Sequence, residues 1–422
     1  MATSVAPRGR RPTRGLAVSV AAMLAALPAF APLAPCNAGE PIRSVEIGRN
    51  REFRINGKPF LPIMLWAQSP SRINDGLSVG VNTFVGNGSS VSDKEFLDAL
   101  GKNGLYGVMG FKQDTVGHRY LLGWIHSDEP DMPRGEGQTG PRQSPEELGA
   151  VFDKIKAADR SRPVFVTFTS GFMRKTSTRE NAAAEALYPA YVKASDVAGF
   201  DYYPIFGENY PSRLDRVAEG VSELAELAGA RPVYVWIEAN TGSRWVTPSL
   251  QVPLKPMHVR AEVWMSVIRG ATAIGYFTHR WKPDYRQFAP EREMAAELKR
   301  INEQLTRLAP AILADPARVA VAISMTDGLP CHVKATEHEG WLYVFAQNMH
   351  VDDNKESLRQ GQDINPRGGG ATITVEGLKA GTIVEVVDEG RAITASDGAF
   401  ADDFGPLAEH VYRIAADQAA GH

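Results

Sequence analysis

The sequence predicts a parallel (β/α)8 barrel, followed by a small antiparallel β-sandwich. Three observations indicate this fold. Eight apolar, strand-like runs follow one another between residues 60 and 277, and amphipathic helical segments separate most of them. Two of these runs end in a carboxylate, at Glu129 and Glu238. Beyond residue 313 the helical pattern stops, and short strand-like runs alternate with turn residues.

An export signal is expected in residues 1–38. A cluster of arginines precedes an alanine-rich apolar stretch, Leu16 to Leu33, and Cys36-Asn-Ala38 supplies small residues before a cut. A membrane-spanning anchor is the alternative, but the stretch is short and is interrupted by Pro28 and Pro32. Arg10-Arg11 is a poor match to a twin-arginine signal, and Pro35 disfavours a lipoprotein anchor at Cys36. We therefore expect a secreted or periplasmic protein without stable membrane insertion.

The predicted barrel domain spans residues 39–314. It opens with a hairpin over residues 42–58, where Asn56-Gly57 is a strong signal for a tight turn. The eight barrel strands are expected at Phe60–Trp66, Val81–Val85, Tyr106–Phe111, Leu121–Ile125, Pro163–Thr169, Gly199–Tyr203, Pro232–Ile237 and Ala273–Phe277.

Amphipathic patterns predict the helices between these strands. In one segment Leu214, Val217, Val221 and Leu224 recur at the spacing of one helical face. The third helix is expected to be short or missing, because only about nine residues separate strands three and four. Helices are expected at Ser92–Lys102, Pro145–Ala158, Glu180–Ala194, Ser212–Leu227, His258–Ile268 and Pro290–Leu313.

The predicted β-sandwich spans residues 315–422 and is expected to pack against the barrel. Asp352 to Gly370 lacks periodicity and is expected to be a loop. Strands are expected at Val319–Ile323, Trp341–Phe345, Ala371–Val375, Thr382–Val386 and Val411–Ile414.

Composition excludes several classes of partner. The chain is 43% hydrophobic and 23% charged, as is usual for a soluble globular protein. Its net charge is −3 and no basic stripe is present, so we expect no nucleic-acid partner. Cys36 and Cys331 are the only cysteines; signal cleavage would leave one, with neither a disulfide nor a zinc-type cysteine cluster.

Glu129 and Glu238 are the predicted catalytic residues. They follow predicted strands four and seven, and reactive groups in such barrels stand at the carboxyl ends of the strands. A charge at the end of a buried strand costs desolvation energy, so it serves chemistry or an ion pair. Paired carboxylates are the working groups of glycoside hydrolysis. A structural ion pair or a solvated loop position is the alternative for each.

This layout resembles the retaining glycoside hydrolases of the clan A-like (β/α)8-barrel superfamily, which carry the acid/base on strand four and the nucleophile on strand seven. The Asn-Glu-Pro common in that superfamily is Asp128-Glu129-Pro130 here, and Asp201-Tyr-Tyr-Pro204 ends strand six. The resemblance implies that Glu238 forms a glycosyl-enzyme, and that Glu129 protonates the leaving oxygen and then deprotonates water. It also implies carboxyl groups roughly 5–5.5 Å apart.

Several further side chains are candidates to bind the sugar. Asp128 replaces an asparagine that binds the sugar 2-hydroxyl in the family, so it can accept that hydrogen bond but not donate one. Its charge beside Glu129 should raise the pKa of the acid. The other candidates are mostly aromatic or histidine side chains, and a core or rim position is the alternative for each: His126, Tyr202, Tyr203, His279, Trp281, Trp66 and Asn82.

The expected function is a retaining glycoside hydrolase acting on an oligo- or polysaccharide, with β-linked bonds favoured. The alternative is a carbohydrate-binding barrel that no longer cleaves. A metal-dependent hydrolase is disfavoured, because His126 and Asp128 are too few as ligands, and we expect neither metal nor cofactor. A phosphate-binding barrel is disfavoured because no glycine-rich loop follows strand seven. The sequence leaves open the sugar, the exo or endo mode of action and the oligomeric state.

Overall fold

The structure is a computed structural model that describes residues 1, 39–135, 140–174 and 186–419. The expected signal peptide, apart from Met1, and the first residues of the expected helix Glu180–Ala194 lie outside the described residues. The barrel and the β-rich domain both belong to one compact unit, Leu33–His422.

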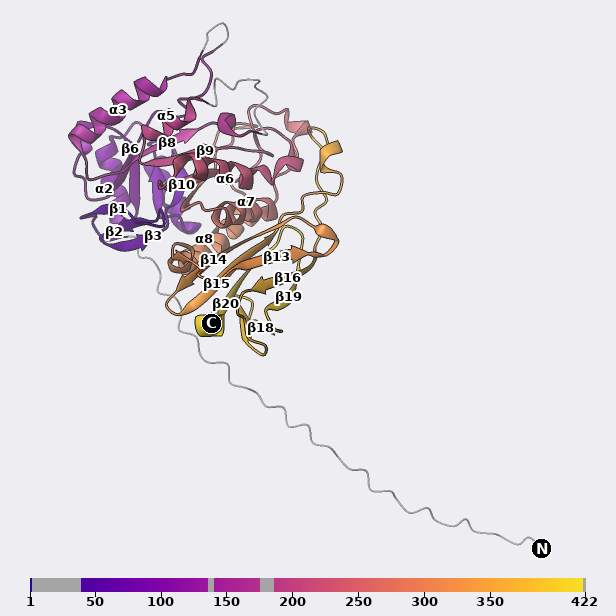
Figure 1. The fold of residues 1–422 in the computed structure, drawn as a ribbon. Coiled ribbons are helices and arrows are strands. Elements are labelled where there is room, and N and C mark those ends of the chain that lie inside the picture. The colour runs from indigo at the N-terminus through magenta and orange to yellow at the C-terminus, as the bar shows by residue number, and fades with distance from the viewer. Residues whose placement is uncertain (2–38, 136–139, 175–185, 420–422) are drawn as a thin grey trace. The chain divides into compact units, whose positions relative to one another are not determined.

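Eight parallel strands close into a barrel, and helices surround it (Figure 1). Each strand pairs with its neighbours in sequence, and the last pairs with the first. This arrangement confirms the predicted fold class. The strands are β4 (Ile63–Trp66), β5 (Thr83–Val85), β6 (Tyr106–Gly110), β7 (Leu121–Ile125), β8 (Val164–Phe168), β9 (Val197–Asp201), β10 (Val233–Glu238) and β11 (Ala273–Phe277).

The helices follow the strands where amphipathic patterns predicted them, with one addition. A short helix, α1, stands between the first two barrel strands, where the (β/α)8 pattern implied a helix but we had singled out no segment. Between β6 and β7 the chain forms only a 3-10 turn, Gln113–Thr115, which confirms the expected gap. The helices are α1 (Ile73–Ser78), α2 (Asp93–Lys102), α3 (Pro145–Ala158), α5 (Tyr188–Lys193), α6 (Arg216–Ala228), α7 (Pro256–Ile268) and α8 (Arg292–Ile312).

A small antiparallel sheet packs against the apolar side chains that fill the barrel interior. It contains β1 (Val45–Ile47), β2 (Phe53–Ile55) and β3 (Lys58–Phe60). Its aromatic rings join the barrel interior: Phe53 stacks on Phe165 at 5.7 Å, and Phe60 meets Tyr106 edge-on at 5.4 Å. The predicted strand Phe60–Trp66 was wrong in extent, because Phe60 ends β3 and the barrel strand begins only after Pro62, which has no N–H for a ladder.

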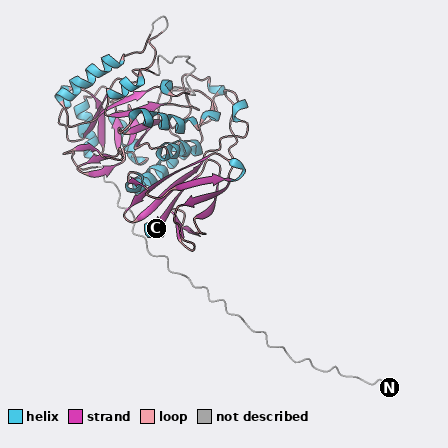
Figure 2. Ribbon diagram, viewed as in Figure 1, coloured by secondary structure: helices cyan, strands magenta, loops and turns pink. Residues whose placement is uncertain are grey.

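The β-rich domain consists of two antiparallel sheets with a hydrophobic core between them. Figure 2 shows these strands apart from the helix-covered barrel. The strand predictions missed β12, β14, β18 and β19, whose exposed positions carry charged or small residues. The strands are β12 (Asp315–Pro316), β13 (Val321–Met325), β14 (Cys331–His338), β15 (Trp341–Asn348), β16 (Gly369–Val375), β17 (Ile383–Val386), β18 (Arg391–Thr394), β19 (Ala399–Phe404) and β20 (Glu409–Ala415).

The six-stranded sheet of this domain packs on helices α7 and α8 of the barrel, as expected. Trp264 of α7 stacks on Phe345 of β15 at 6.2 Å. The side chain of Gln347 donates to the carbonyl of Ala261, and Thr336 donates to that of Ala311. Among the helices of the described residues, none combines the length and apolar character that a membrane span needs.

Candidate active site

Glu129 and Glu238 stand at the carboxyl face of the barrel, where we expected them. Glu238 is the last residue of β10, the seventh barrel strand. Glu129 lies in the loop that follows β7, the fourth barrel strand. The structure gives each of them a different carboxyl partner, however, so the two glutamates belong to two separate carboxyl pairs.

The first pair, which we name the open pair, consists of Glu129 and Asp201. Asp201 ends β9, and its side chain is hydrogen-bonded to that of Glu129. Two carboxyl groups can form this bond only when one of them carries a proton. Burial and the charges of Glu129 and Asp128 raise the pKa of Asp201 well above its usual value. Burial also raises the pKa of Glu129, which favours retention of the shared proton.

Glu129 is held in a strained backbone conformation. Its φ is +46°, in the left-handed region that residues other than glycine rarely adopt. Its carboxylate accepts a hydrogen bond from Arg142 at 3.2 Å. Such strain costs on the order of 1–3 kcal/mol and persists where surrounding contacts over-determine the geometry. The contacts with Arg142 and Asp201 fix the Glu129 carboxyl at the mouth of the barrel.

Two aspartates extend the acidic cluster around Glu129. Asp128 is exposed, yet loss of solvation and the charge of Glu129 raise the pKa of its carboxyl group to about 7. Asp131 is buried and accepts hydrogen bonds from the Thr169 hydroxyl and backbone N–H and from the Tyr188 hydroxyl. Asp131 therefore ties the loop to the end of β8.

The second pair, which we name the buried pair, consists of Glu238 and Glu262 of α7. Both are 0% exposed, and their carboxyl groups are hydrogen-bonded to each other. Glu238 also accepts backbone N–H bonds from Ile205 at 3.0 Å and Phe206 at 2.5 Å. Burial raises the pKa of Glu238 to about 7, against the lowering effect of those amides. Burial and the charge of Glu238 raise the pKa of Glu262 well above its usual value, which favours a proton shared by the pair.

Tyr203 lies within electrostatic reach of members of both pairs. Burial and then the charges of Asp201, Asp128, Glu129 and Glu238 raise the pKa of its hydroxyl well above its usual value. All four carboxyl groups are therefore within electrostatic reach of one side chain. The tyrosine hydroxyl stays protonated and can donate a hydrogen bond into the cleft.

Aromatic rings continue from Tyr203 across the loops after β10 and β11. Tyr203 packs against Phe277 at 5.1 Å, and Phe277 stacks on Trp281 at 5.3 Å. Trp281 in turn contacts Trp245 and Tyr285. Such rings offer apolar faces of the kind that pack on the C–H face of a sugar.

His279 lies among these rings, with its own ring 5.1 Å from that of Phe277. Burial lowers its pKa to about 4, so it is neutral near neutral pH. Trp66 packs edge-on against Trp236 at the end of β4.

The structure does not bring three other predicted residues to this cleft. The ring of His126 is buried and hydrogen-bonded to the carbonyl of Ala194. Tyr202 belongs to the outer core and donates to Glu208. Asn82 lies before β5, at the amino ends of the strands, where its side chain bonds the backbone of Leu61 and Ile63. These three contacts are structural.

Sequence reasoning missed Asp201, Arg142, Glu262 and Trp245. Asp201 was visible as a carboxylate after an apolar run, but the predicted strand Gly199–Tyr203 ended two residues too late. Glu262 is the one acidic residue in an otherwise largely apolar helical stretch, Val259 to Ile268, and this isolation could have marked it as a candidate.

Within the described residues, no group of three or more His, Cys, Asp or Glu side chains is arranged to hold a metal ion.

Comparisons with known proteins support the fold. No family model matches the sequence, and no curated protein matches it. The structure is similar to that of an α-amylase from Geobacillus thermoleovorans complexed with acarbose, with a TM-score of 0.53 and 10% identity over 87% of this chain and 99% of that chain. It is also similar to AmyP in complex with maltose, with a TM-score of 0.50 and 8% identity over 85% of this chain and 97% of that chain. The likeness confirms the predicted barrel fold.

Proposed function

We propose that the protein is a glycoside hydrolase that acts on an oligo- or polysaccharide by a retaining, double-displacement mechanism. The observation that carries this proposal is the open pair, two hydrogen-bonded carboxyl groups of raised pKa at the carboxyl face of the barrel, with aromatic rings nearby. Glycoside hydrolysis needs a carboxylic acid that keeps its proton near neutral pH and a second carboxylate beside it.

Glu129 is the proposed general acid/base. It gives the proton held with Asp201 to the glycosidic oxygen as the bond to the anomeric carbon breaks. Glu129 is then ionised, and in the second step it removes a proton from the attacking water. Arg142, hydrogen-bonded to Glu129, stabilises the ionised form between these steps.

Glu238 is the first candidate for the nucleophile, because it lies at the end of the seventh barrel strand. In the structure both of its oxygens accept amide hydrogen bonds and its side chain is 0% exposed. Attack on a sugar therefore requires the segment Ile205–Phe206 to move away from the carboxylate. Movement of such loops on substrate binding is common in enzymes.

Asp201 is the second candidate for the nucleophile, because it is the more accessible carboxylate. It is partly exposed and already touches Glu129. That contact is shorter than the roughly 5–5.5 Å expected of a retaining pair. Asp201 would have to swing away from Glu129 when a sugar enters the cleft.

Hydrolysis of aryl glycosides of both anomers, with the product anomer followed by NMR, tests the proposal. We expect one series to be cleaved with retention, β-glycosides being favoured by the resemblance to clan A-like enzymes. Cleavage with inversion would refute the double displacement. Binding of sugars without cleavage would favour the alternative of a carbohydrate-binding barrel.

Azide then assigns the two roles. With an activated aryl glycoside, Glu129→Ala should be accelerated by azide and yield a glycosyl azide of retained configuration, because the first step needs little acid help. The variant lacking the nucleophile should yield the inverted azide. Glu238→Ala and Asp201→Ala, compared side by side, identify which of these carboxylates attacks.

A further inference from the structure

A groove runs along the rim of the barrel beside the candidate active site. We name it the Trp245 groove; its volume is 570 Å³, within the range of ligand pockets of about 300–1,000 Å³. One wall is the loop after β10 and the other is a segment from the β-rich domain. The groove is lined by Asn209, Trp245, Val246, Thr247, Ser249, Leu250, Gln251, Val252, Pro253, Gln360, Gly361 and Asp363.

Hydrogen bonds hold both walls of this groove in place. Asn209 is buried and bonds each wall: its side chain bonds the backbone of Leu250 and Val252, and its carbonyl accepts from the N–H of Gly361 at 2.7 Å. An ion pair of 2.6 Å joins Lys255, directly before α7, to Asp363 of the second wall. The groove therefore exists before any ligand arrives.

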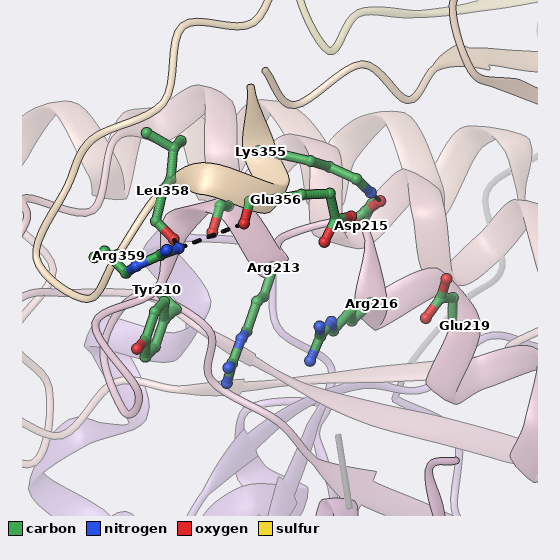
Figure 3. A pocket seen from close by; sticks show the side chains of 10 residues that line it. Tyr210, Arg213, Asp215, Arg216, Glu219, Lys355, Glu356, Leu358 and Arg359 are labelled. Carbon is green, nitrogen blue, oxygen red and sulfur yellow. Dashed lines mark hydrogen bonds and ion pairs between the residues drawn. The ribbon is translucent and has the colours of Figure 1, made fainter. Parts of the chain in front are cut away.

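A charged pocket behind the second wall fixes the segment that carries Gln360 and Gly361. Figure 3 shows this pocket, with the side chains of Lys355 and Asp215 meeting across it. The guanidinium of Arg359 donates to the backbone carbonyls of its own turn, including that of Ser357 at 2.9 Å. These contacts are internal, so the charged pocket supports the groove and offers no separate site.

The Trp245 groove is continuous with the candidate active site. The ring of Trp245 contacts those of Phe206 and Trp281, at 6.1 and 5.8 Å. The backbone N–H of Phe206 holds Glu238, and the side chain of Gln251 donates to the carbonyl of the same residue. A chain lying in the groove would therefore reach toward the two carboxyl pairs.

The groove wall combines exposed apolar and polar side chains. Trp245 is 55% exposed and Leu250 is 65% exposed, which is unusual for such large apolar residues. Gln360, Thr247 and Asp363 add amide, hydroxyl and carboxylate groups. The guanidinium of Arg244 lies over the Trp245 ring at 4.7 Å, and more than half of the Trp245 side chain stays exposed. Apolar faces beside hydroxyl-binding groups match the two surfaces of a sugar ring.

We propose that the Trp245 groove binds sugar units of a chain whose scissile bond lies at Glu129, so that the substrate is an extended oligo- or polysaccharide rather than a simple glycoside. This inference rests on the proposed function. Trp245 supplies the stacking surface, and Gln360 and Asp363 bind hydroxyls from the opposite wall. The β-rich domain thereby contributes directly to substrate binding.

The test compares the full-length protein with Trp245→Ala and Trp245→Phe. Ile383→Ala is the matched control, because Ile383 is 52% exposed on β17 and does not line the groove. For each protein, kcat/KM is measured on an aryl monoglycoside and on the hexaose of the sugar that is cleaved. We expect Trp245→Ala to lower kcat/KM for the hexaose roughly 10-fold, the effect of losing one buried apolar contact, and to lower kcat/KM for the monoglycoside much less. Trp245→Phe should recover much of the loss.

Equal losses on the two substrates, or none on the hexaose, would overturn the groove assignment while leaving the hydrolase intact. If the wild type cleaves no glycoside, the proposed function fails, and the groove is tested by binding alone. Cello-, xylo- and maltohexaose at millimolar concentration are then titrated against tryptophan fluorescence and saturation-transfer NMR. Binding that Trp245→Ala abolishes would support the groove, and absence of binding by all three would overturn it.

Discussion

The open pair and the buried pair contain the same chemistry in opposite surroundings. Glu129 and Asp201 share a hydrogen bond beside Arg142, at the mouth of a cleft. Glu238 and Glu262 share one where neither residue is exposed, and no cation contributes to the pKa of either. A proton in the open pair can exchange with solvent and substrate. A proton in the buried pair has only a structural effect: it removes the repulsion between two carboxylates that lie side by side.

The difference separates two uses of a raised pKa. Loss of solvation raises the pKa of all four carboxyl groups, and it is the largest cause in each case. Only the open pair combines that shift with accessibility, which is what general acid catalysis requires. A perturbed pKa therefore identifies a candidate acid here only when it is considered together with exposure.

The largest expected effect comes from removing the acid of the open pair. Glu129→Gln should lower kcat/KM on glycosides with poor leaving groups by roughly 10²–10⁴-fold, because no other group delivers the proton. Steady-state kinetics with alkyl and nitrophenyl glycosides measures the difference. Glu46→Gln, at an exposed position of β1, is the control and should leave activity unchanged. An active Glu129→Gln enzyme would place the acid elsewhere.

The next largest effect is expected from replacing Asp201, the second member of the open pair. Asp201→Asn keeps a hydrogen-bond donor to Glu129 but removes the second ionisable group of the pair, so the upper pKa of the pair should disappear and Glu129 should titrate alone at lower pH. The basic limb of the pH–rate profile should move to lower pH, and activity at neutral pH should drop roughly 10-fold for each unit lost.

Carbon NMR of the labelled Glu129 carboxyl reports the same shift without any substrate. Asp153→Asn, on the exposed face of α3, should not change it. An unchanged Glu129 titration in Asp201→Asn would show that the pair does not share a proton.

A change in stability is expected from the buried pair. Because the folded state raises the pKa of Glu238 from 4.5 to about 7, it binds more protons than the unfolded state over that range, and stability falls as pH rises through it. Glu262→Gln donates a hydrogen bond to Glu238 without needing a proton. It should flatten this decline and add on the order of 1–3 kcal/mol at alkaline pH.

Urea unfolding at several pH values measures this effect. Glu293→Gln on α8 is exposed and serves as the control. Destabilisation of Glu262→Gln across the whole pH range would mean that the buried carboxyl group is needed for packing and not for its proton.

The smallest expected effect concerns the ion pair between Arg142 and Glu129. The side chains of Arg142 and Glu129 are 46% and 16% exposed, so Arg142→Gln should change the free energy of unfolding by less than about 1 kcal/mol. The lost cation should raise the pKa of Glu129 slightly. Arg134→Gln, on the same loop, is the matched control. A large loss of stability would show that Arg142 determines the conformation of the loop.

Much of the barrel followed from local patterns in the sequence. Apolar runs of strand length separated by helical periodicity identified each barrel strand, because a strand covered on both sides is apolar throughout. The ends of β7 and β10 were located closely enough to single out Glu129 and Glu238. The β-rich domain was predicted less fully. Strands such as β14 and β18 contain charged residues at partly exposed positions, which weaken the apolar signal.

The sequence by itself determined the fold and the positions of Glu129 and Glu238, since strand length, periodicity and turn residues are local properties of the chain. Only the tertiary structure decided how the carboxyl groups are paired. Closure of the barrel brings Asp201 of β9 to Glu129, and the packing of α7 on β10 brings Glu262 to Glu238. Local sequence patterns do not determine which strand ends and helix faces come into contact. Those contacts determine the solvation, proton sharing and accessibility of each carboxyl group.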